Sequence, residues 1–194
     1  MSLQPHPVPS APEWAPTAVF PRLGERAGHV ELRGATSRDI DGVHGLIERH
    51  TLAGHLLPRT REDVASRIRQ FVVAMSEDAV VGCAELAPLG SNVAEVRSLV
   101  VSDELQGAGV GRALVSALIL AARRGEYERL CAFAHTPAFF VRLGFSIVPH
   151  LHVPEKVFTD CVQCPLFRMC AQHAVVLPLD GAAAAPAGLV ELGW

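Results

Sequence analysis

The chain has 194 residues, of which 49% are apolar, and this is enough for one globular domain with a substantial core. The formal net charge is -3 and no polybasic run occurs, so we expect no nucleic acid and no membrane as partner, but a small molecule. Neither a signal-like start nor a long uncharged apolar run is found, and we therefore expect a cytoplasmic location.

The first 50 residues change character at about residue 28. Residues 1–27 are rich in proline, which favours extended and unpacked chain, so we expect a flexible leader there. The alternating segment 29–36 predicts a first strand, and Ser37 is the expected cap of a helix that runs to about His50. Thr60 is the expected cap of a second helix over 60–71, with acidic residues in its first turn.

The central part of the chain predicts strands and one long helix. The runs 71–76 and 79–89 flank a turn at Glu77 and Asp78, which is typical of an antiparallel hairpin. A third strand is expected over 94–101, followed by a glycine-rich loop and a helix that begins near Arg112. This strand, loop and helix form the unit on which the functional prediction depends.

The last part of the chain predicts a strand at 129–135, a short helix at 136–143 that Pro137 opens, and strands at 144–148 and 174–179. Residues 181–194 lack periodicity and are expected to be a tail. One domain is therefore expected over 28–180. The order of elements indicates an α/β fold in which helices pack on the faces of one sheet.

The glycine-rich loop QGAGVG suits an anionic ligand. A helix that follows closely spaced glycines presents unpaired amide N–H groups and the positive end of its dipole, and Gly107, Gly109 and Gly111 let the backbone approach a phosphate. Glycines before a helix can also have a purely structural role. A P-loop is excluded because no Lys followed by Ser or Thr ends the loop, and the early βαβ unit of a dinucleotide-binding fingerprint is missing.

Two segments resemble the sequence motifs of the GNAT acetyltransferase superfamily. EVRSLVVSDELQGAGVGRALV resembles its first cofactor motif, with Gln106, Gly109 and Gly111 at the pattern positions, and FAHTPAFFVRLGF resembles its second. The likeness extends over about 30–179. It implies a GNAT fold, which is a mixed, mostly antiparallel central sheet with flanking helices, in which the family's fourth and fifth strands splay apart.

The resemblance implies acetyl-CoA, or coenzyme A, as the co-substrate. Its pantetheine arm would pair with the backbone of Leu99, Val100 and Val101, and Phe139, Phe140 and Arg142 would flank its far half. For both phenylalanines, core packing is the alternative. The pyrophosphate would lie on the loop amides, with the Arg112 side chain as an additional contact. The loop residues are Gln106, Gly107, Ala108, Gly109, Val110, Gly111 and Arg112.

Acetyl transfer to an amine requires a base for the ammonium proton and a donor for the developing oxyanion. Glu95 is our candidate base, acting through water, with a solvated charge at the strand end as the alternative. The backbone amide near Leu99 is the candidate oxyanion donor. Many family members carry a tyrosine acid in the second motif, but this chain has phenylalanine there and its one tyrosine is Tyr127. A thiol with a pKa near 8.5 leaves as thiolate without much help from an acid.

The acceptor amine is indicated by segments outside the cofactor motifs. LLPRTREDVASRI and PEKVFTDCVQCPLFRMC resemble the short N-acetylglutamate synthases of arginine biosynthesis, which implies L-glutamate as acceptor. Such a dicarboxylate needs fixed cations, and the candidates are Arg59, Arg61, Arg97 and Lys156. Solvated surface charges are the alternative for each. Another amine, a protein N-terminus or a non-catalytic sensor of acetyl-CoA or arginine remain competing hypotheses, and a homodimer is left open.

The five cysteines do not predict a secreted disulfide framework, because their number is odd and no signal peptide is apparent. Cys83 and Cys131 lie in apolar runs and are expected to be buried. We expect no bound metal. The spacing of Cys161, Cys164 and Cys170 is compatible with zinc, and reduced structural thiols are the preferred interpretation.

Overall fold

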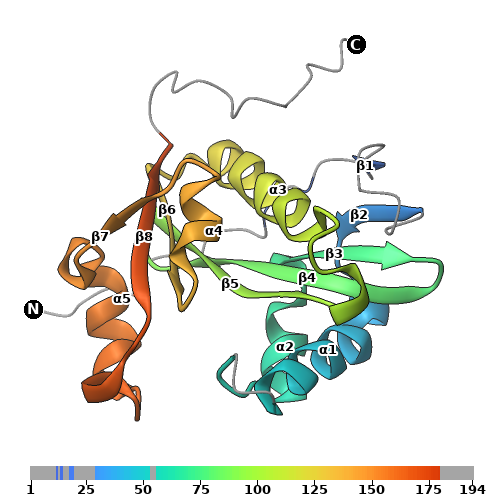
Figure 1. Ribbon diagram of the computed structural model, residues 1–194, viewed down its shortest axis with the longest axis horizontal. Coiled ribbons are helices and arrows are strands. Elements are labelled where there is room, and N and C mark those ends of the chain that lie inside the picture. Colours follow the sequence, from blue (N-terminus) through green and yellow to red (C-terminus); the bar gives the residue numbers. More distant parts are fainter. Residues whose placement is uncertain (1–11, 13, 15–17, 20–28, 53–55, 180–194) are drawn as a thin grey trace, which may run out of the picture.

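The computed structural model describes residues 12, 14, 18–19, 29–52 and 56–179, and it is built around one eight-stranded sheet (Figure 1). The strand order is β1-β2-β3-β4-β5-β6-β8-β7, and every neighbouring pair is antiparallel except β5 and β6. The strands are β1 (Ala18–Val19), β2 (Val30–Gly34), β3 (Phe71–Ser76), β4 (Ala79–Pro88), β5 (Val93–Val101), β6 (Arg129–Ala134), β7 (Ser146–Val148) and β8 (His173–Pro178). The expected mixed, mostly antiparallel sheet is confirmed.

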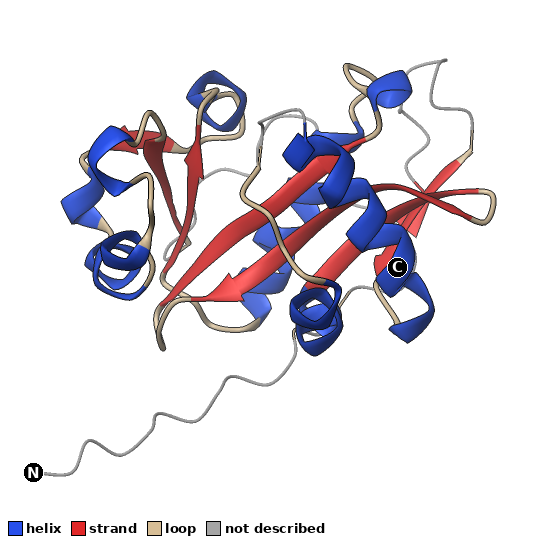
Figure 2. Cartoon of the chain, turned by 90° about the horizontal axis from the view of Figure 1, so that it is seen from below, coloured by secondary structure: helices blue, strands red, loops and turns tan. Residues whose placement is uncertain are grey.

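Helices cover both faces of the sheet (Figures 1 and 2). The α-helices are α1 (Ile40–Leu52), α2 (Arg61–Arg67), α3 (Val110–Arg124), α4 (Pro137–Val141) and α5 (Pro154–Thr159). Short 3-10 turns are η2 (Ser37–Asp39), η3 (Ile68–Gln70), η4 (Asp103–Leu105), η5 (His150–His152), η6 (Cys161–Gln163) and η7 (Phe167–Met169). Helices α3 and α4 pack on one face, whereas α1 and α2 pack on the other. No helix in the described ranges is long and apolar enough to span a bilayer.

The core is divided by the sheet into two layers. On the α3 side, Leu114, Leu118 and Leu130 are completely buried and pack with the inward residues of β2 to β6. On the α1 and α2 side, Leu46 and Phe71 belong to a second apolar cluster. Because apolar burial is the dominant favourable term in folding, these two layers hold the sheet between its helices.

Polar caps set the beginnings of the first two helices. Thr60 caps α2 as expected, since its hydroxyl accepts a hydrogen bond from the Asp63 amide at 3.1 Å. The first cap is Thr36 and not Ser37. Thr36 and Asp39 form a reciprocal capping box, in which the Thr36 amide donates to the Asp39 carboxylate at 2.7 Å. The expectation for Ser37 was wrong by one residue, because Ser and Thr are both favoured N-caps and the Asp39 carboxylate completes the capping box with Thr36.

Part of the predicted leader contributes to the fold. Strand β1 pairs with β2, and the Trp14 indole donates a hydrogen bond to the Arg69 carbonyl at 3.0 Å. A Cβ at Gly34 would lie only 2.3 Å from the Trp14 ring, so glycine makes this contact possible. The amphipathic indole of Trp14 thus contacts the sheet through its ring and the Arg69 carbonyl through its N–H group. The expected tail, 181–194, lies outside the described residues.

The sheet opens between β5 and β6. These two parallel strands are paired only at Val93–Arg129, Ala94–Leu130 and Glu95–Cys131, and beyond Glu95 they separate. Farther along, β5 contains a bulge in which Ser98 and Leu99 lie opposite the single residue Ala84, and Ser98 has a φ of 47°. The separation confirms the expected splay, and it leaves room for a site inside the sheet.

Candidate active site

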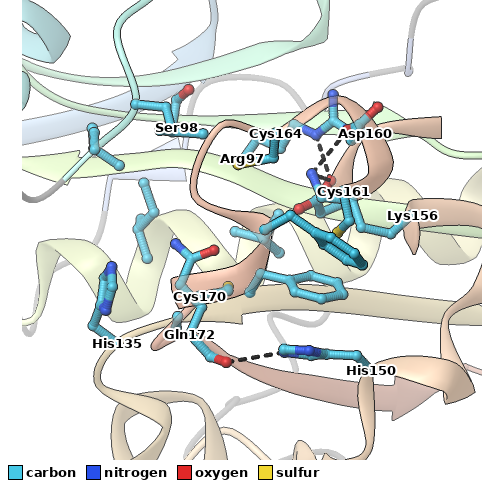
Figure 3. A pocket seen from close by; sticks show the side chains of 18 of the residues that line it. Arg97, Ser98, His135, His150, Lys156, Asp160, Cys161, Cys164, Cys170 and Gln172 are labelled. Carbon is cyan, nitrogen blue, oxygen red and sulfur yellow. Dashed lines mark hydrogen bonds and ion pairs between the residues drawn. The ribbon is translucent and has the colours of Figure 1, made fainter. Parts of the chain in front are cut away.

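A pocket of about 780 Å³ lies where β5 and β6 diverge. The pocket is lined by the loop before α2, by β5 and by the segment from α5 to Cys170. Figure 3 shows Arg97 and Ser98 of β5 together with Lys156, Asp160 and the cysteines of that last segment. Of the residues predicted for catalysis or binding, the pocket is lined by Arg59, Glu95, Arg97, Leu99, Phe140 and Lys156. The fold thus brings together three of the four candidate cations and the candidate base from three separate parts of the chain.

Glu95 is buried, with 3% of its surface exposed, although it lines the pocket. Its Oε2 atom accepts hydrogen bonds from the Lys156 ammonium at 2.9 Å and from the Arg97 guanidinium. Both cations also contact the Asp160 carboxylate, the Lys156 contact at 2.9 Å, as Figure 3 shows. A buried carboxylate is stable only when paired, and here two cations and a second carboxylate complete the network. The alternative of a solvated strand-end charge for Glu95 is excluded by this burial.

Arg59 occupies the second charged centre of the pocket. Its guanidinium contacts the fully buried carboxylate of Glu85 and donates to the Ser98 hydroxyl at 3.0 Å. It also pairs with Asp63 and lies over the Phe71 ring, 5.7 Å from the ring centre. Arg59 is therefore fixed between the start of α2 and the bulge of β5, and solvation of its charge is excluded as the alternative because its side chain is only 13% exposed.

The charges in these networks are mutually reinforced. Burial lowers the pKa of Arg97, but the neighbouring Glu95 and Asp160 carboxylates outweigh it, so the pKa is raised. Burial likewise raises the pKa of Asp160, yet hydrogen bonding to Lys156 and attraction to Arg97 bring the pKa below its ordinary value. The same balance lowers the pKa of Asp63, where Arg59 is the main partner. Arg97, Asp160 and Asp63 are thus charged at neutral pH.

The bulge reorganises the face that β5 presents. Ala94 and Val96 pack toward α3, whereas Glu95 and Arg97 project into the charged network on the opposite side. The extra residue lets Ser98 project to the same side as Arg97, and Leu99 and Val101 return to the α3 layer. Val100 is buried against the α1 and α2 layer. The bulge therefore changes the course of the backbone at Leu99, where β5 lines the pocket.

The glycine loop begins α3 with left-handed glycines. Gly109 is the N-cap with a φ of 93°, and Gly107 has a φ of 79°. The Gln106 amide donates to the Asp103 carbonyl and the Ala108 amide to the Leu105 carbonyl, at 3.3 and 3.2 Å. The first intrahelical bond is that of Ala113 to Gly109, so the preceding amides of the helix have no intrahelical acceptor. These amides belong to Val110, Gly111 and Arg112.

The other predicted residues, apart from Phe140, lie outside the lining of the pocket. Arg61 is exposed and pairs with Asp41 at 2.7 Å, and Arg112 and Arg142 are exposed. Phe139 lies beside Gly111, at 3.6 Å from the position of a Cβ there. Phe140 is buried and packs edge-on between Phe139 and Phe145, so it packs in the core, which was the alternative to cofactor binding. Tyr127 is buried in the α3 layer, where burial raises its pKa.

The cysteines fall into two groups. Cys83 and Cys131 are completely buried, as expected, whereas Cys161, Cys164 and Cys170 line the pocket, and all five are free thiols. Within the described part of the chain, no three His, Cys, Asp or Glu side chains gather as a metal ion would require. The zinc alternative for the three pocket cysteines therefore has no geometric support.

Several residues of the site were missed by sequence reasoning. Asp63, Asp160 and Glu85 complete the charged networks, and helix α5, which carries Lys156, was not predicted. Glu85 could have been found, because a lone carboxylate within the apolar run AVVGCAELAPL signals a buried cationic partner. Lys156 and Asp160 are four residues apart, a spacing that favours an ion pair on a helix.

The pocket combines two chemical capabilities, and the start of α3, outside its lining, adds a third. A buried carboxylate at Glu95 can accept a proton, and Arg59, Arg97 and Lys156 can hold carboxylates. Unpaired amides at the start of α3 can hold a phosphate. These features suit the transfer of a group from a phosphate-bearing donor to an acidic acceptor.

Comparison with known proteins agrees with this geometry. Residues 67–147 match the family model of the acetyltransferase (GNAT) domain. An uncharacterized N-acetyltransferase of Chlorobaculum tepidum is 29% identical over 148 residues, which cover 76% of this chain and 96% of that protein. An amino-acid acetyltransferase of Mycobacterium tuberculosis is 30% identical over 133 residues, or 66% of this chain and 75% of that protein.

Among solved structures, the N-acetylglutamate synthase of Neisseria gonorrhoeae in complex with coenzyme A and N-acetyl-glutamate is similar, with a TM-score of 0.71 and 28% identity. The match covers 78% of this chain and 35% of that one. The chain studied here thus spans about a third of the length of that synthase.

Proposed function

Because the chain belongs to the GNAT acetyltransferase family and is an acyltransferase, we propose that it transfers the acetyl group of acetyl-CoA directly to the α-amino group of L-glutamate. The observation that carries this proposal is that Arg59, Arg97 and Lys156 line one pocket together with the buried Glu95. The resemblance to amino-acid acetyltransferases and to an N-acetylglutamate synthase supports it. The reaction would belong to arginine biosynthesis in the cytoplasm, and a homodimer is the assembly we would test first.

The cofactor would lie between the glycine loop and the diverging strands. The amides of Gly107, Gly109 and the first turn of α3 are the donors that would hold its pyrophosphate, since those of Gln106 and Ala108 already have acceptors. Arg112 is exposed at the same helix start and would add a cationic contact. The backbone of Leu99 to Val101 would hold the pantetheine arm, and Phe139 would flank it beside Gly111.

The chain's own residues supply the chemistry of transfer. Glu95, acting through water, would accept the proton of the acceptor ammonium, and the free amine would then attack the thioester carbonyl. The backbone amide near Leu99 would donate to the oxyanion. Coenzyme A would leave as a thiolate, so no acid is required, in keeping with the burial of Tyr127 away from the pocket.

Acceptor recognition would use an exchange of ion-pair partners. Asp63 and Asp160 are only half-buried. Asp63 pairs with Arg59, and Asp160 pairs with both Arg97 and Lys156. Two substrate carboxylates can take these places without leaving a buried cation unpaired. Glu95 and Glu85 are buried deeper and would keep the cations oriented.

A thiol-release assay over a panel of acceptors tests the proposal. With acetyl-CoA fixed, L-glutamate should give the highest kcat/KM, followed by other acidic amino acids. Neutral amino acids, polyamines and peptides with a free N-terminus should be poor acceptors. A polyamine or peptide as the best acceptor would contradict the glutamate assignment but not the enzyme class. Coenzyme A binding in calorimetry without any turnover on the panel would instead favour a sensor.

A further inference from the structure

Three thiols line the pocket, and the transfer chemistry does not use them. Cys161, Cys164 and Cys170 all line the pocket between α5 and β8 (Figure 3). Cys161 and Cys164 are half-buried and Cys170 is exposed. A thiol must be reachable to react, and the pocket makes these three reachable, whereas Cys83 and Cys131 are sealed within the sheet.

The backbone places Cys161 and Cys164 at the two ends of one tight turn. The Cys164 amide donates a hydrogen bond to the Cys161 carbonyl at 3.0 Å, across the 3-10 turn η6. A turn closed in this way keeps its first and fourth Cα atoms within about 7 Å, and side chains three residues apart in a 3-10 turn project in the same direction. Disulfides join Cα atoms about 4.4 to 6.8 Å apart. The pair can therefore be bridged by side-chain rotation with little movement of the backbone.

The geometry points to a reversible dithiol and disulfide pair formed by Cys161 and Cys164 at the mouth of the acceptor pocket. The oxidant is a low-molecular-weight disulfide. One thiolate attacks it and releases one small thiol, and the second cysteine then displaces the other small thiol as the Cys161–Cys164 bond forms. The two cysteines lose two electrons and two protons, and the small disulfide gains both.

Oxidation of this pair would act on the charged network beside it. Cys161 directly follows Asp160, whose carboxylate contacts both Arg97 and Lys156. A covalent closure of the turn would restrict where Asp160 can lie, and so would change the Michaelis constant for the acceptor. This consequence rests on the proposed function, but formation of the disulfide does not.

Burial raises the pKa of the Cys161 thiol, while the Lys156 ammonium opposes that effect. Exchange needs the thiolate, so oxidation should be faster at mildly alkaline pH than at neutral pH. Burial raises the pKa of Cys83 to about 12, and Cys131 is shifted in the same direction for the same reason. The two buried thiols are thus unreactive internal references in the same molecule.

The test uses the full chain, first reduced and then equilibrated with mixtures of glutathione and its disulfide. Free thiols are alkylated and the digested protein is mapped by mass. Trypsin leaves Cys161 and Cys164 in one peptide, 157–168, and Cys170 in another, because Lys156 and Arg168 bound the first peptide. The expected product is peptide 157–168 without any alkyl group and lighter by two hydrogen atoms than its reduced, unalkylated form. Cys83 and Cys131 should be alkylated only after denaturation.

Two variants complete the experiment. Cys164→Ser should abolish the lighter peptide, whereas Cys170→Ser should retain it. In the parent protein, a cross-link between peptide 157–168 and the peptide with Cys170 would overturn the assignment, as would a stable glutathione adduct on Cys161. Full alkylation of Cys161 and Cys164 at every ratio of glutathione to its disulfide would also overturn it. Acceptor kinetics of the oxidised form are a separate readout. If L-glutamate is not a substrate in either form, the proposed function fails, while the peptide mass still decides the disulfide.

Discussion

At the scale of single residues, the site depends on carboxylates that are buried with their cations. Glu95 and Glu85 are almost or wholly inaccessible, and each contacts an arginine that faces the pocket. Their roles differ, since Glu95 lines the pocket and Glu85 does not. We therefore expect changes at Glu95 to affect chemistry and changes around Glu85 to affect stability.

Replacing Glu95 with glutamine keeps the shape and removes the base. We expect kcat to fall by about 100-fold or more, which is the usual contribution of a general base. Calorimetry should find coenzyme A binding unchanged, because the glycine loop lies outside the Glu95 network. A kcat within a few-fold of the parent value would remove Glu95 from the mechanism.

Arg59 and Arg61 form a matched pair for a test of stability. Arg59→Met leaves the buried Glu85 with only the more distant Arg67, whose Nη1 lies 3.7 Å away, so the free energy of unfolding should fall by about 3 kcal/mol. Arg61→Met breaks an exposed pair with Asp41 and should leave the free energy of unfolding almost unchanged. Urea unfolding of both variants gives the comparison. Equal losses would show that burial of Glu85 is not the cause.

At the scale of elements, caps and left-handed glycines decide where helices begin. The capping box at Thr36 and the glycine at position 109 begin helical segments in different ways, one through a carboxylate and one through backbone conformation. The capping box should make stability depend on pH, whereas Gly109 should matter through its backbone conformation.

Asp39 should make stability depend on acidic pH. Hydrogen bonding from Arg33 lowers the pKa of Asp39 from 3.8 to about 2. Because the folded pKa lies below the unfolded one, the stabilisation is complete above pH 3.8 and is lost as the pH falls through about 2. A shift of this size corresponds to about 2 kcal/mol. Urea unfolding of the parent and of Asp39→Asn should differ by about that amount at neutral pH and converge near pH 2, and a constant difference would contradict the linkage.

Gly109 should be important because its backbone adopts a left-handed conformation that favours glycine. Gly109→Ala forces an L-residue into a left-handed conformation, so the free energy of unfolding should fall by about 1 kcal/mol, with weaker coenzyme A binding. Gly45→Ala is the control, because its Cβ would meet only the end of the Arg49 side chain at 3.7 Å inside α1. It should raise stability by up to about 1 kcal/mol and leave binding unchanged. The free energy from urea unfolding and the Kd from calorimetry distinguish the two variants.

Periodicity in the sequence predicted the long elements well. Strand β3 has the expected bounds and strand β4 ends within one residue of them, because both are apolar runs that end at turn residues. The region 149–172 received no assignment, since α5 and its 3-10 turns are too short to show a period. The whole side of the pocket formed by α5 to Cys170 lies in that region.

The candidate site could be predicted from the sequence only in part. Arg59, Arg97, Lys156 and Glu95 were identified by residue type and resemblance, and the fold gathers them. The bulge at Ser98 has no sequence signal, because no glycine marks its positive φ. Arg61 lies near Arg59 in the sequence, but it is two residues farther along, at the first position of α2, and its side chain is exposed. Pairings such as Arg97–Asp160 join residues far apart in the chain, which periodicity cannot reveal.

At the scale of the whole molecule, the sheet consists of two halves that share only three residue pairs between β5 and β6. Backbone groups that face the opening have no strand partner and should exchange their amide hydrogens readily. We expect coenzyme A to slow hydrogen exchange in 97–101 and 132–134, on both sides of the opening. Strands β3 and β4 are paired along their lengths and serve as the internal control. Protection limited to α3 would mean that the cofactor does not enter between the strands.

Beyond Glu95, the two halves are joined across the opening by Arg97–Asp160 and Lys156–Glu95. A peptide hydrogen bond between strands fixes both distance and direction, whereas an ammonium or guanidinium group can rotate from one carboxylate to another within reach. The two halves are therefore joined there by ion pairs that can exchange partners one at a time. An arriving anion can loosen it and a departing one can restore it, while the strands on either side keep their positions.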